Sequence, residues 1–562
     1  MLRATQVTRW LDSARAIAPM SAISGPFLLA IDAGTESVRV GVFDVAGTFM
    51  AHAAAPYDTH YPRTGWAEQD PQAWWTALHE ALRSALMHLE ARCGRSAIRH
   101  VVGIGLDATT CTLVTLDGQD RPVRPALLWM DVRASQQAQR IFETGHPALC
   151  YSPSGLAAEW MLPKALWLSE HEAETYARTT RLVEYTDWLA YKLCGRWALN
   201  LNTVTQRWHY NARGWDQAGQ QGQILHWPTS LFEAVGLADL AAKFPTDVVP
   251  PGERLGGLLP EVAQAVGAPE LTGVPVFEGG GDAFVGLLGL NVTCPGQIGL
   301  ITGSSNVIGA FSRDGFHVPG LFGGFPDAIV PGLWLVEAGQ ASTGSVLAWF
   351  KRTFALDLPS DAAYQQLDEQ ASQLEMGAGG VIALDHFQGN RTPYTDSRSR
   401  GAVWGLTLAS TRGHVYRALL EGIAYGTRQI LEVLQQAATT AAGDVHAGVT
   451  APPAQQLDAI VACGGATRSP IFMQLYADIC GLPISVMRVP DASLVGGAIL
   501  AAVGAGLYHD LPTAASAMTH VARTYQPDMS QHARAGFYFE QYKQTYANLR
   551  DLMHRAPPSI SP

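Results

Sequence analysis

The chain of 562 residues carries a formal net charge of −11, and 47% of its residues are hydrophobic against 15% that are charged. This length exceeds what one hydrophobic core usually serves, so we expect two or more domains. The acidic balance, without a Lys/Arg cluster, excludes a nucleic-acid partner. The sequence has no run of about 18 apolar residues, so we predict no membrane span. The seven cysteines are scattered and lack C-x-x-C spacing, which indicates reduced thiols of a cytoplasmic protein rather than disulfides or a zinc site.

The first 24 residues carry three arginines and a single acid, Asp12, without the apolar core of a secretory signal. We predict that residues 1–24 form a disordered extension, with a transit peptide as the alternative. The first apolar, β-branched run begins only after this segment.

The first predicted element is a hairpin at 28–44, where the sequence reads LLAIDAGTESVRVGVFD. A plain hairpin more often closes with Asn-Gly or Asp-Gly in a two-residue loop. The loop at 34–37 instead offers free backbone N–H groups and small side chains. Asp32 is a lone carboxylate at the end of an apolar strand, where it needs a partner or a cation.

The elements that follow alternate between strands and longer helical segments. Residues 70–92 predict an amphipathic helix, with Asp70 and a proline at its start, as is typical of a helix N-terminus. Residues 100–117 predict a strand, a polar turn and a second strand. Residues 414–437 predict a long helix, and 458–486 predict a strand, a Gly-rich turn, a helix and a strand. This order is typical of α/β domains whose sheets are covered by helices.

The first hairpin has an internal echo. Residues 29–47 and residues 299–315, GLITGSSNVIGAFSRDG, both read as an apolar strand, a glycine with small polar residues, and a second apolar strand. The echo predicts two related domains that face each other across a cleft. Glycine and proline punctuate the sequence near 290, where we expect the boundary.

Glycine-bearing turns are the candidate anion sites, because glycine lets backbone N–H groups converge on a phosphate. None of them is a Walker loop or a Rossmann turn. Asp282 follows three glycines, and this position suits either a helix N-cap or a general base for a substrate hydroxyl. The spacing alone does not choose between the two. The turns lie at 34–37, 279–282, 303–306 and 464–467.

The motifs IDAGTESVR, GGGDAFVG, TGSSN and CGGATRSPIFMQLYADICGLPI resemble the FGGY family of carbohydrate kinases, over about 27–545 and in the family's order. EWMLPKALWL, EYTDWLAYKLCG, VEAGQASTGS and FQGNRTPYTDSRSRG look most like ribulokinases and related pentulose kinases. The resemblance implies two ribonuclease H-like domains of the actin/Hsp70/sugar-kinase superfamily with a central cleft. The first, 25–290, would bind sugar, phosphate and magnesium, the second, 291–545, would bind ATP, and 546–562 would be a tail.

The resemblance also implies roles for single residues. Asp282 matches the family's catalytic base, which takes the proton from the attacking sugar hydroxyl. Asp32 matches the acid that holds Mg²⁺, a cation that keeps several waters and takes only one or two carboxylates. Three turns match the ATP-binding loops: Gly34, Thr35 and Glu36 the first phosphate loop, Gly303, Ser304 and Ser305 the second, and Gly464, Gly465 and Ala466 the turn under the adenosine.

For the sugar, Thr110 and Cys111 fall where ribulokinases line the substrate pocket, and Glu337 matches their substrate-contacting acid. Arg207 falls where those enzymes often have lysine. Arginine and lysine differ in hydrogen-bond geometry, so this departure leaves the exact sugar open.

The expected function is therefore ATP-dependent phosphorylation of a ketopentose such as ribulose, with Mg²⁺. Kinases for xylulose, erythritol or glycerol remain the alternatives within the class, and an actin- or Hsp70-like ATP-driven switch is the alternative outside it. A silent sugar sensor would be expected to have lost Asp32 or Asp282, and both are present. A homodimer stays open, because many relatives are dimers but the sequence carries no interface signature.

Overall fold

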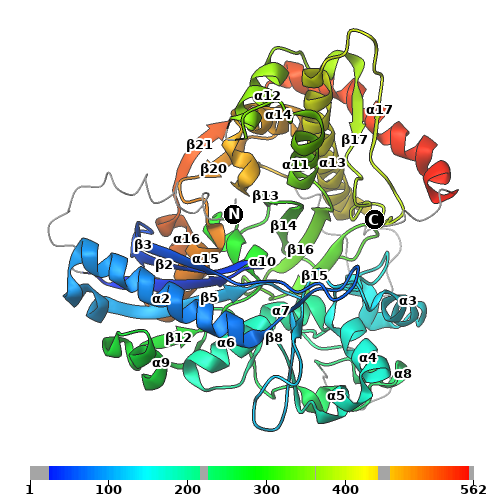
Figure 1. The fold of residues 1–562 in the computed structure, drawn as a ribbon. Coiled ribbons are helices and arrows are strands. Elements are labelled where there is room, and N and C mark those ends of the chain that lie inside the picture. The colour runs from blue at the N-terminus through cyan, green and yellow to red at the C-terminus, as the bar shows by residue number, and fades with distance from the viewer. Residues whose placement is uncertain (1–24, 216–225, 361, 441–455, 556–562) are drawn as a thin grey trace.

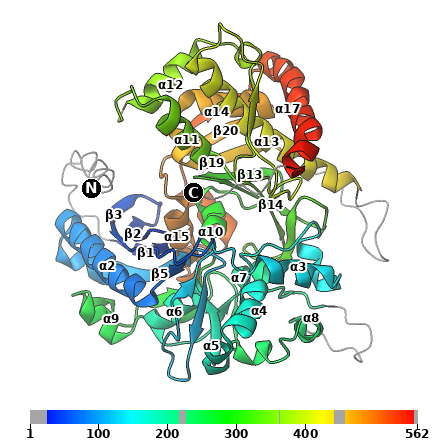
Figure 2. The same ribbon diagram turned by 45° about the vertical axis from the view of Figure 1, so that its right-hand side comes forward.

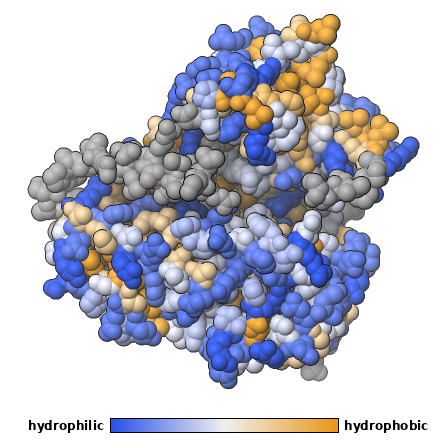
Figure 3. Space-filling model, viewed as in Figure 1, coloured by the Kyte–Doolittle hydropathy of each residue, from blue (hydrophilic) through white to orange (hydrophobic). Residues whose placement is uncertain are grey.

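The computed structural model describes residues 25–215, 226–360, 362–440 and 456–555. The chain folds into two lobes (Figure 1), and most of the surface on the face shown in Figure 3 is hydrophilic. The predicted extension 1–24 lies outside the described residues. No helix within the described ranges is long and apolar enough to cross a lipid bilayer.

The first lobe is built on a six-stranded sheet with the order β11-β12-β5-β1-β2-β3. β1 pairs with β2 antiparallel and with β5 parallel, and all seven of its residues are buried. The predicted hairpin at 28–44 therefore forms the centre of this sheet. The strands are β1 (Phe27–Ala33), β2 (Ser37–Asp44), β3 (Phe49–Pro56), β5 (Val101–Ala108), β11 (Arg254–Gly257) and β12 (Pro275–Phe277).

The helix predicted at 70–92 is α2 (Pro71–Cys93), which packs against β2 and β3 (Figure 1). Asp70 is its N-cap and accepts a hydrogen bond from the Gln72 amide, as the start signal in the sequence predicts. The apolar stripe of α2 is buried against the sheet, so this helix covers one face of the first lobe.

The second lobe repeats the plan with seven strands in the order β15-β16-β14-β13-β19-β20-β21. β13 and β14 form an antiparallel hairpin and β13 runs parallel to β19, just as β1 pairs with β2 and β5. The predicted α/β class with two related lobes is confirmed. The strands are β13 (Gln297–Thr302), β14 (Asn306–Ser312), β15 (Phe322–Pro326), β16 (Trp334–Gln340), β19 (Ala459–Gly464), β20 (Ile484–Met487) and β21 (Val521–Tyr525).

The other elements surround the two sheets. In the first lobe they are β4 (Glu68–Gln69), η1 (Arg95–His100), β6 (Leu113–Leu116), β7 (Ala126–Leu127), α3 (Ser135–Glu143), η2 (Pro147–Tyr151), α4 (Met161–His171), α5 (Ala173–Arg178), β8 (Arg181–Glu184), α6 (Tyr185–Cys194), β9 (Leu199–Asn200), α7 (Leu201–Arg207), α8 (Thr229–Ala234), η3 (Leu240–Lys243), β10 (Val248–Val249), α9 (Pro260–Ala265), η4 (Pro269–Leu271) and α10 (Asp282–Gly289). In the chain after these they are α11 (Gly344–Phe354), α12 (Ala363–Ser372), η5 (Ala378–Gly380), β17 (Ile382–Leu384), β18 (Ala402–Trp404), α13 (Arg412–Thr440), η6 (Gly465–Arg468), α14 (Pro470–Cys480), α15 (Ala492–Gly504), α16 (Leu511–Met518) and α17 (Met529–Arg555).

Helices α10 and α15 lie between the two sheets and pack against each other (Figure 2). Their backbones approach closely, because a Cβ on Gly496 would lie only 2.0 Å from the Val285 carbonyl oxygen. α15 follows the predicted boundary at 290 in the chain, yet it also packs on β1 and β5 of the first lobe. The division into 25–290 and 291–545 stays a prediction, and α17 continues past residue 545 without a break.

Candidate active site

A cleft of about 780 Å³ lies between the lobes and is lined by turns from both sheets and by the N-terminal ends of α10 and α15. Turns at the ends of β1, β5, β13 and β19 meet here. β1 runs parallel to β5 and β13 runs parallel to β19, so the carboxyl ends of each pair lie at the same edge of their sheet, and the turns that follow line the cleft. Most residues predicted for the site line this cleft: Thr35, Thr110, Cys111, Arg207, Asp282, Gly303, Ser304, Ser305, Glu337, Gly464 and Gly465.

The other predicted residues do not line the cleft. Asp32 and Gly34 are buried behind its wall, whereas Glu36 is exposed and Ala466 packs against the apolar core of the second lobe. The Glu36 carbonyl accepts a hydrogen bond from the Tyr57 amide. The Ala466 amide likewise donates to the Thr302 hydroxyl at 3.2 Å, and the roles of Glu36 and Ala466 in ATP binding stay predictions.

Asp32 is buried behind Arg39, which lines what we call the acidic end of the cleft. It faces Arg39 across the β1–β2 hairpin, and the two side chains form an ion pair at 2.7 Å. Arg39 also reaches the second lobe, where it binds Asp491 at 2.8 Å. Asp107 lies beside Asp32 on β5, and burial raises the pKa of both carboxyl groups. No amide, hydroxyl or cation of the described residues hydrogen-bonds either oxygen of Asp107.

Sequence reasoning missed Arg39, Asp107 and Asp491. The hairpin register could have found Arg39, because a turn at 34–37 sets Asp32 directly opposite it. Asp107 stands near the end of an apolar strand, as Asp32 does, which is the same signal of a buried carboxylate. Nothing in the sequence pointed to Asp491, which lies in the other lobe.

Asp282 is the first residue of α10, and its side chain lines the cleft. The N-cap of this helix is Gly281, so the helix-cap alternative for Asp282 does not apply. Its Oδ1 accepts a hydrogen bond from the Ala283 amide at 2.7 Å. Burial, assisted by the nearby charge of Asp32, raises the pKa of Asp282 to about 7. A carboxylate in this state can accept a proton near neutral pH.

Two ion pairs join the lobes at the other end of the cleft. Arg207, at the end of α7, binds Glu337 of β16 at 2.7 Å, and both side chains are almost fully buried. Glu159 of the first lobe and Arg391 of the second form the next pair at 3.3 Å. The sequence singled out Arg207 and Glu337 but missed the second pair, whose members are more than 200 residues apart in the chain. All four side chains line the cleft.

Trp129 also lines the cleft, where its indole N–H donates to the Thr35 hydroxyl at 2.9 Å. Cys111 has a left-handed backbone, with φ at 57°, in the turn that follows β5. Burial raises the pKa of the Cys111 thiol to about 12, so this cysteine is a thiol and not a reactive thiolate. Together, Thr110, Cys111 and Trp129 form a wall of the cleft next to Asp282.

Gly464 ends β19 at the nucleotide end that the sequence predicts, with φ at 101°. We expect Gly464→Ala to lower stability by about 1–3 kcal/mol from its left-handed backbone alone. The total loss of stability should exceed this range, because the new Cβ would lie 1.9 Å from the Thr302 carbonyl oxygen. Gly465→Ala is the matched control for stability, since its Cβ would meet no atom within 4 Å. Thermal unfolding of the two variants tests this, and equal melting temperatures would contradict it.

Comparison with known proteins identifies the family. Models of the N-terminal and C-terminal domains of the FGGY family of carbohydrate kinases match residues 27–289 and 299–505. The ribulokinase of Mycolicibacterium smegmatis is 33% identical over 88% of this chain and 88% of its own length. The FGGY carbohydrate kinase domain-containing protein of Homo sapiens is 30% identical over 89% of this chain and 92% of its own length.

The fold agrees with these sequence matches. The xylulose kinase of Rhodospirillum rubrum superposes with a TM-score of 0.78 at 26% identity, covering 94% of this chain and 100% of that one. Domain models that together span most of the chain are sufficient to assign the family. The chain belongs to the FGGY family of carbohydrate kinases and is a phosphotransferase acting on sugars.

Proposed function

We propose that this kinase transfers the γ-phosphoryl group of ATP to a hydroxyl of a ketopentose, ribulose first among them, with Asp282 as the general base. The observation that carries the proposal is that Asp282 shares one cleft with the Arg207–Glu337 pair and with the glycine turns of the second lobe. The 33% identity to a ribulokinase supports the choice of sugar.

The mechanism follows from the contents of the cleft. The acceptor hydroxyl loses its proton to the Asp282 carboxylate while its oxygen attacks the γ-phosphorus of ATP, and ADP leaves as the bond between the γ-phosphorus and the bridging oxygen breaks. The raised pKa makes this carboxylate a better base than an exposed one. Phosphoryl transfer asks the protein mainly to position reactants and to stabilise charge. The turns at 303–305 and 464–465 line the cleft, and glycine-bearing turns of this kind suit phosphate oxygens. A closure of the lobes on the substrates would limit the access of water.

The acidic end fits a magnesium ion. Asp32 and Asp107 offer oxygen ligands, and besides the Arg39 ion pair of Asp32 and the hydrogen bond between the two carboxyl groups these buried side chains have no hydrogen-bond partner among the described residues. Mg²⁺ takes only one or two carboxylates and keeps several waters, so these two carboxyl groups are sufficient to hold it. When bound with ATP, Mg²⁺ neutralises charge on the phosphate oxygens.

The sugar end suits an uncharged polyhydroxy substrate. Each arginine there is already paired with a glutamate, so the four side chains carry no net charge and offer both donors and acceptors to hydroxyl groups. A substrate carboxylate would have to compete with Glu337 and Glu159 for the same arginines. Xylulose, erythritol and glycerol fit the same argument and are the alternatives.

The test is ADP release with Mg-ATP against D- and L-ribulose, D- and L-xylulose, ribitol, erythritol, glycerol and gluconate. We expect one of the two ribuloses to give the highest kcat/KM, with gluconate inactive. A preference for another neutral sugar would change the substrate that we assign but not the proposed phosphoryl transfer. ADP release that ignores every sugar would overturn the proposal and favour an ATP-driven switch.

The pH dependence gives a further prediction. Asp282 works as a base only when ionised, so kcat/KM for the sugar should fall about tenfold per pH unit below its pKa and level off above it. That pKa lies at about 7. A profile that stays flat from about pH 5.5 to 8, roughly one and a half units below that value to one unit above it, would contradict the base assignment.

The stability of the fold should fall as the pH rises, whereas kcat/KM should rise. Burial raises the pKa of Glu184, Glu278 and Asp282 to about 7, so the folded chain holds protons that the unfolded chain has already released at lower pH. These groups stabilise the fold below their unfolded pKa values, and that contribution is lost as the pH rises towards 7. Melting temperatures of Glu278→Gln and of the unmodified protein, compared at about pH 5.5 and 7.5, measure it. The advantage of the unmodified carboxyl group should shrink at the higher pH.

A further inference from the structure

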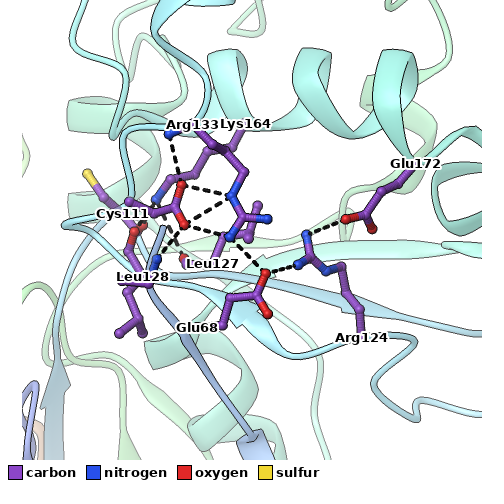
Figure 4. Close-up of polar contacts among 10 residues, drawn as sticks. Glu68, Cys111, Arg124, Leu127, Leu128, Arg133, Lys164 and Glu172 are labelled. Atoms are coloured by element: carbon purple, nitrogen blue, oxygen red, sulfur yellow. Dashed lines mark hydrogen bonds and ion pairs between the residues drawn. The ribbon is translucent and has the colours of Figure 1, made fainter. Parts of the chain in front are cut away.

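Lys164 lies on α4 with its side chain fully buried in the first lobe. Its ammonium group donates to the carbonyl oxygens of Cys111, at 2.5 Å, and Leu128, at 2.6 Å, and lies 3.5 Å from that of Leu127 (Figure 4). No carboxylate of the described residues lies within ion-pair distance of this nitrogen. The lysine is therefore bound by backbone carbonyl groups alone.

This arrangement is unusual within the molecule. The other well-buried cations, Arg207 and Arg417, each bind a glutamate. Arg133, the neighbour of Lys164 in Figure 4, binds Asp131 and Glu68. An ammonium group without a counterion is costly to bury, and burial lowers the pKa of Lys164. A methionine or leucine would fill the same space at lower cost, so the reason for a lysine must lie in what its N–H groups hold.

The carbonyl groups that Lys164 binds belong to two chain segments that build one wall of the cleft. Cys111 follows Thr110 in the turn after β5, and its left-handed backbone is one that a residue with a side chain rarely adopts. Leu128 precedes Trp129, which lines the cleft and binds the Thr35 hydroxyl. The ammonium group thus ties the 110–111 turn to the 127–129 segment.

The 110–111 turn also touches the backbone that carries Asp282. A Cβ on Gly281 would lie 2.0 Å from Cγ2 of Thr110, so Thr110 lies directly against the residue that precedes Asp282. A shift of this turn would change both the wall of the cleft and the space in front of Asp282. Lys164 itself does not line the cleft and therefore does not touch a substrate.

We propose that Lys164 is a positioning residue, whose ammonium group fixes the Thr110–Cys111 turn and the Leu128–Trp129 segment so that the acceptor sugar is held against Asp282. The assignment of this wall to the sugar rests on the proposed function. Two of the three predicted ATP loops, at 303–305 and 464–466, belong to the second lobe, and Lys164 contacts neither of them. Lys164 is linked to the first loop, at 34–36, only indirectly, through the hydrogen bond from Trp129 to the Thr35 hydroxyl. Loss of the ammonium group should therefore affect the sugar and leave ATP nearly unaffected.

The chain offers a matched control in Lys243. Its ammonium group also donates to two backbone carbonyls, of Thr179 at 2.9 Å and Tyr176 at 3.3 Å, but it has a counterion in Asp239 at 3.4 Å and lies outside the cleft lining. We expect Lys164→Met to raise the sugar KM about tenfold or more, with the ATP KM within about twofold of the unmodified protein. Lys243→Met should leave both KM values unchanged. If Lys164→Met does not fold, Lys164→Gln, which keeps an N–H donor, makes the same comparison with a smaller expected rise.

Equal rises in both KM values, or a lower melting temperature with both KM values unchanged, would mean that Lys164 is only structural and would overturn the proposal. A second readout needs no turnover. Hydrogen exchange should become faster in 108–116 and 126–131 of Lys164→Gln and stay unchanged in 459–464, and unchanged exchange in all three would also overturn it. The sugar panel on the unmodified protein tests the proposed function separately, so failure of one is distinguishable from failure of the other.

Discussion

Asp282→Asn is expected to lower kcat by about 10²–10⁴-fold, the usual contribution of a general base, while ATP binding stays measurable. The amide has nearly the shape of the carboxyl group but cannot take the proton of the acceptor hydroxyl. Its Oδ1 can still accept the hydrogen bond that the Ala283 amide donates to Asp282. ADP release measures the first effect and calorimetric titration with ATP the second.

The stability of this variant separates a catalytic role from a structural one. Burial raises the pKa of Asp282 to about 7. Above that pH the side chain is ionised in both states, and the charge costs more free energy in the folded protein than in the unfolded chain. Asp282→Asn removes this cost, so its melting temperature should equal or exceed that of the unmodified protein at about pH 8. The residual activity should also lose the rise with pH that we expect of the unmodified enzyme. Turnover at the normal rate would show that another group is the base.

The sheet hairpins could be predicted because their signals are local. Two apolar strands with a polar glycine turn define 28–44, and the same pattern at 299–315 gives the equivalent hairpin of the second sheet. Asp32 could be found for the same reason, since a carboxylate that ends an apolar strand is conspicuous in any sequence. Asp107 carries the same signal near the end of β5.

The partners of these residues could not be predicted, because the contacts join distant parts of the chain. Arg39 and Asp491 are 452 residues apart, and Glu159 and Arg391 are 232 apart. Lys164 stands in an apolar helix, where a lysine ordinarily extends its head group to water. Only the fold shows that its ammonium group is enclosed by carbonyl groups.

The Arg207–Glu337 pair gives the other large effect that we expect. Both side chains are about 7% exposed and come from different lobes, so removal of one partner leaves an uncompensated buried charge. Such losses cost about 3–5 kcal/mol, and Glu337→Gln and Arg207→Met should each lower the melting temperature. The double variant should regain much of this stability, because it leaves neither charge buried alone.

The sugar KM should not recover in the double variant as the melting temperature does. If the pair contacts the acceptor sugar, Glu337→Gln, Arg207→Met and the double variant should all raise the sugar KM by tenfold or more, which corresponds to about 1.4 kcal/mol, while the ATP KM changes little. Recovery of stability without recovery of the sugar KM would assign the pair to substrate binding. Recovery of both the stability and the sugar KM in the double variant would make the pair a closure contact between the lobes and remove it from the sugar site. Equal changes in the sugar and ATP KM values would contradict its assignment to the sugar end of the cleft.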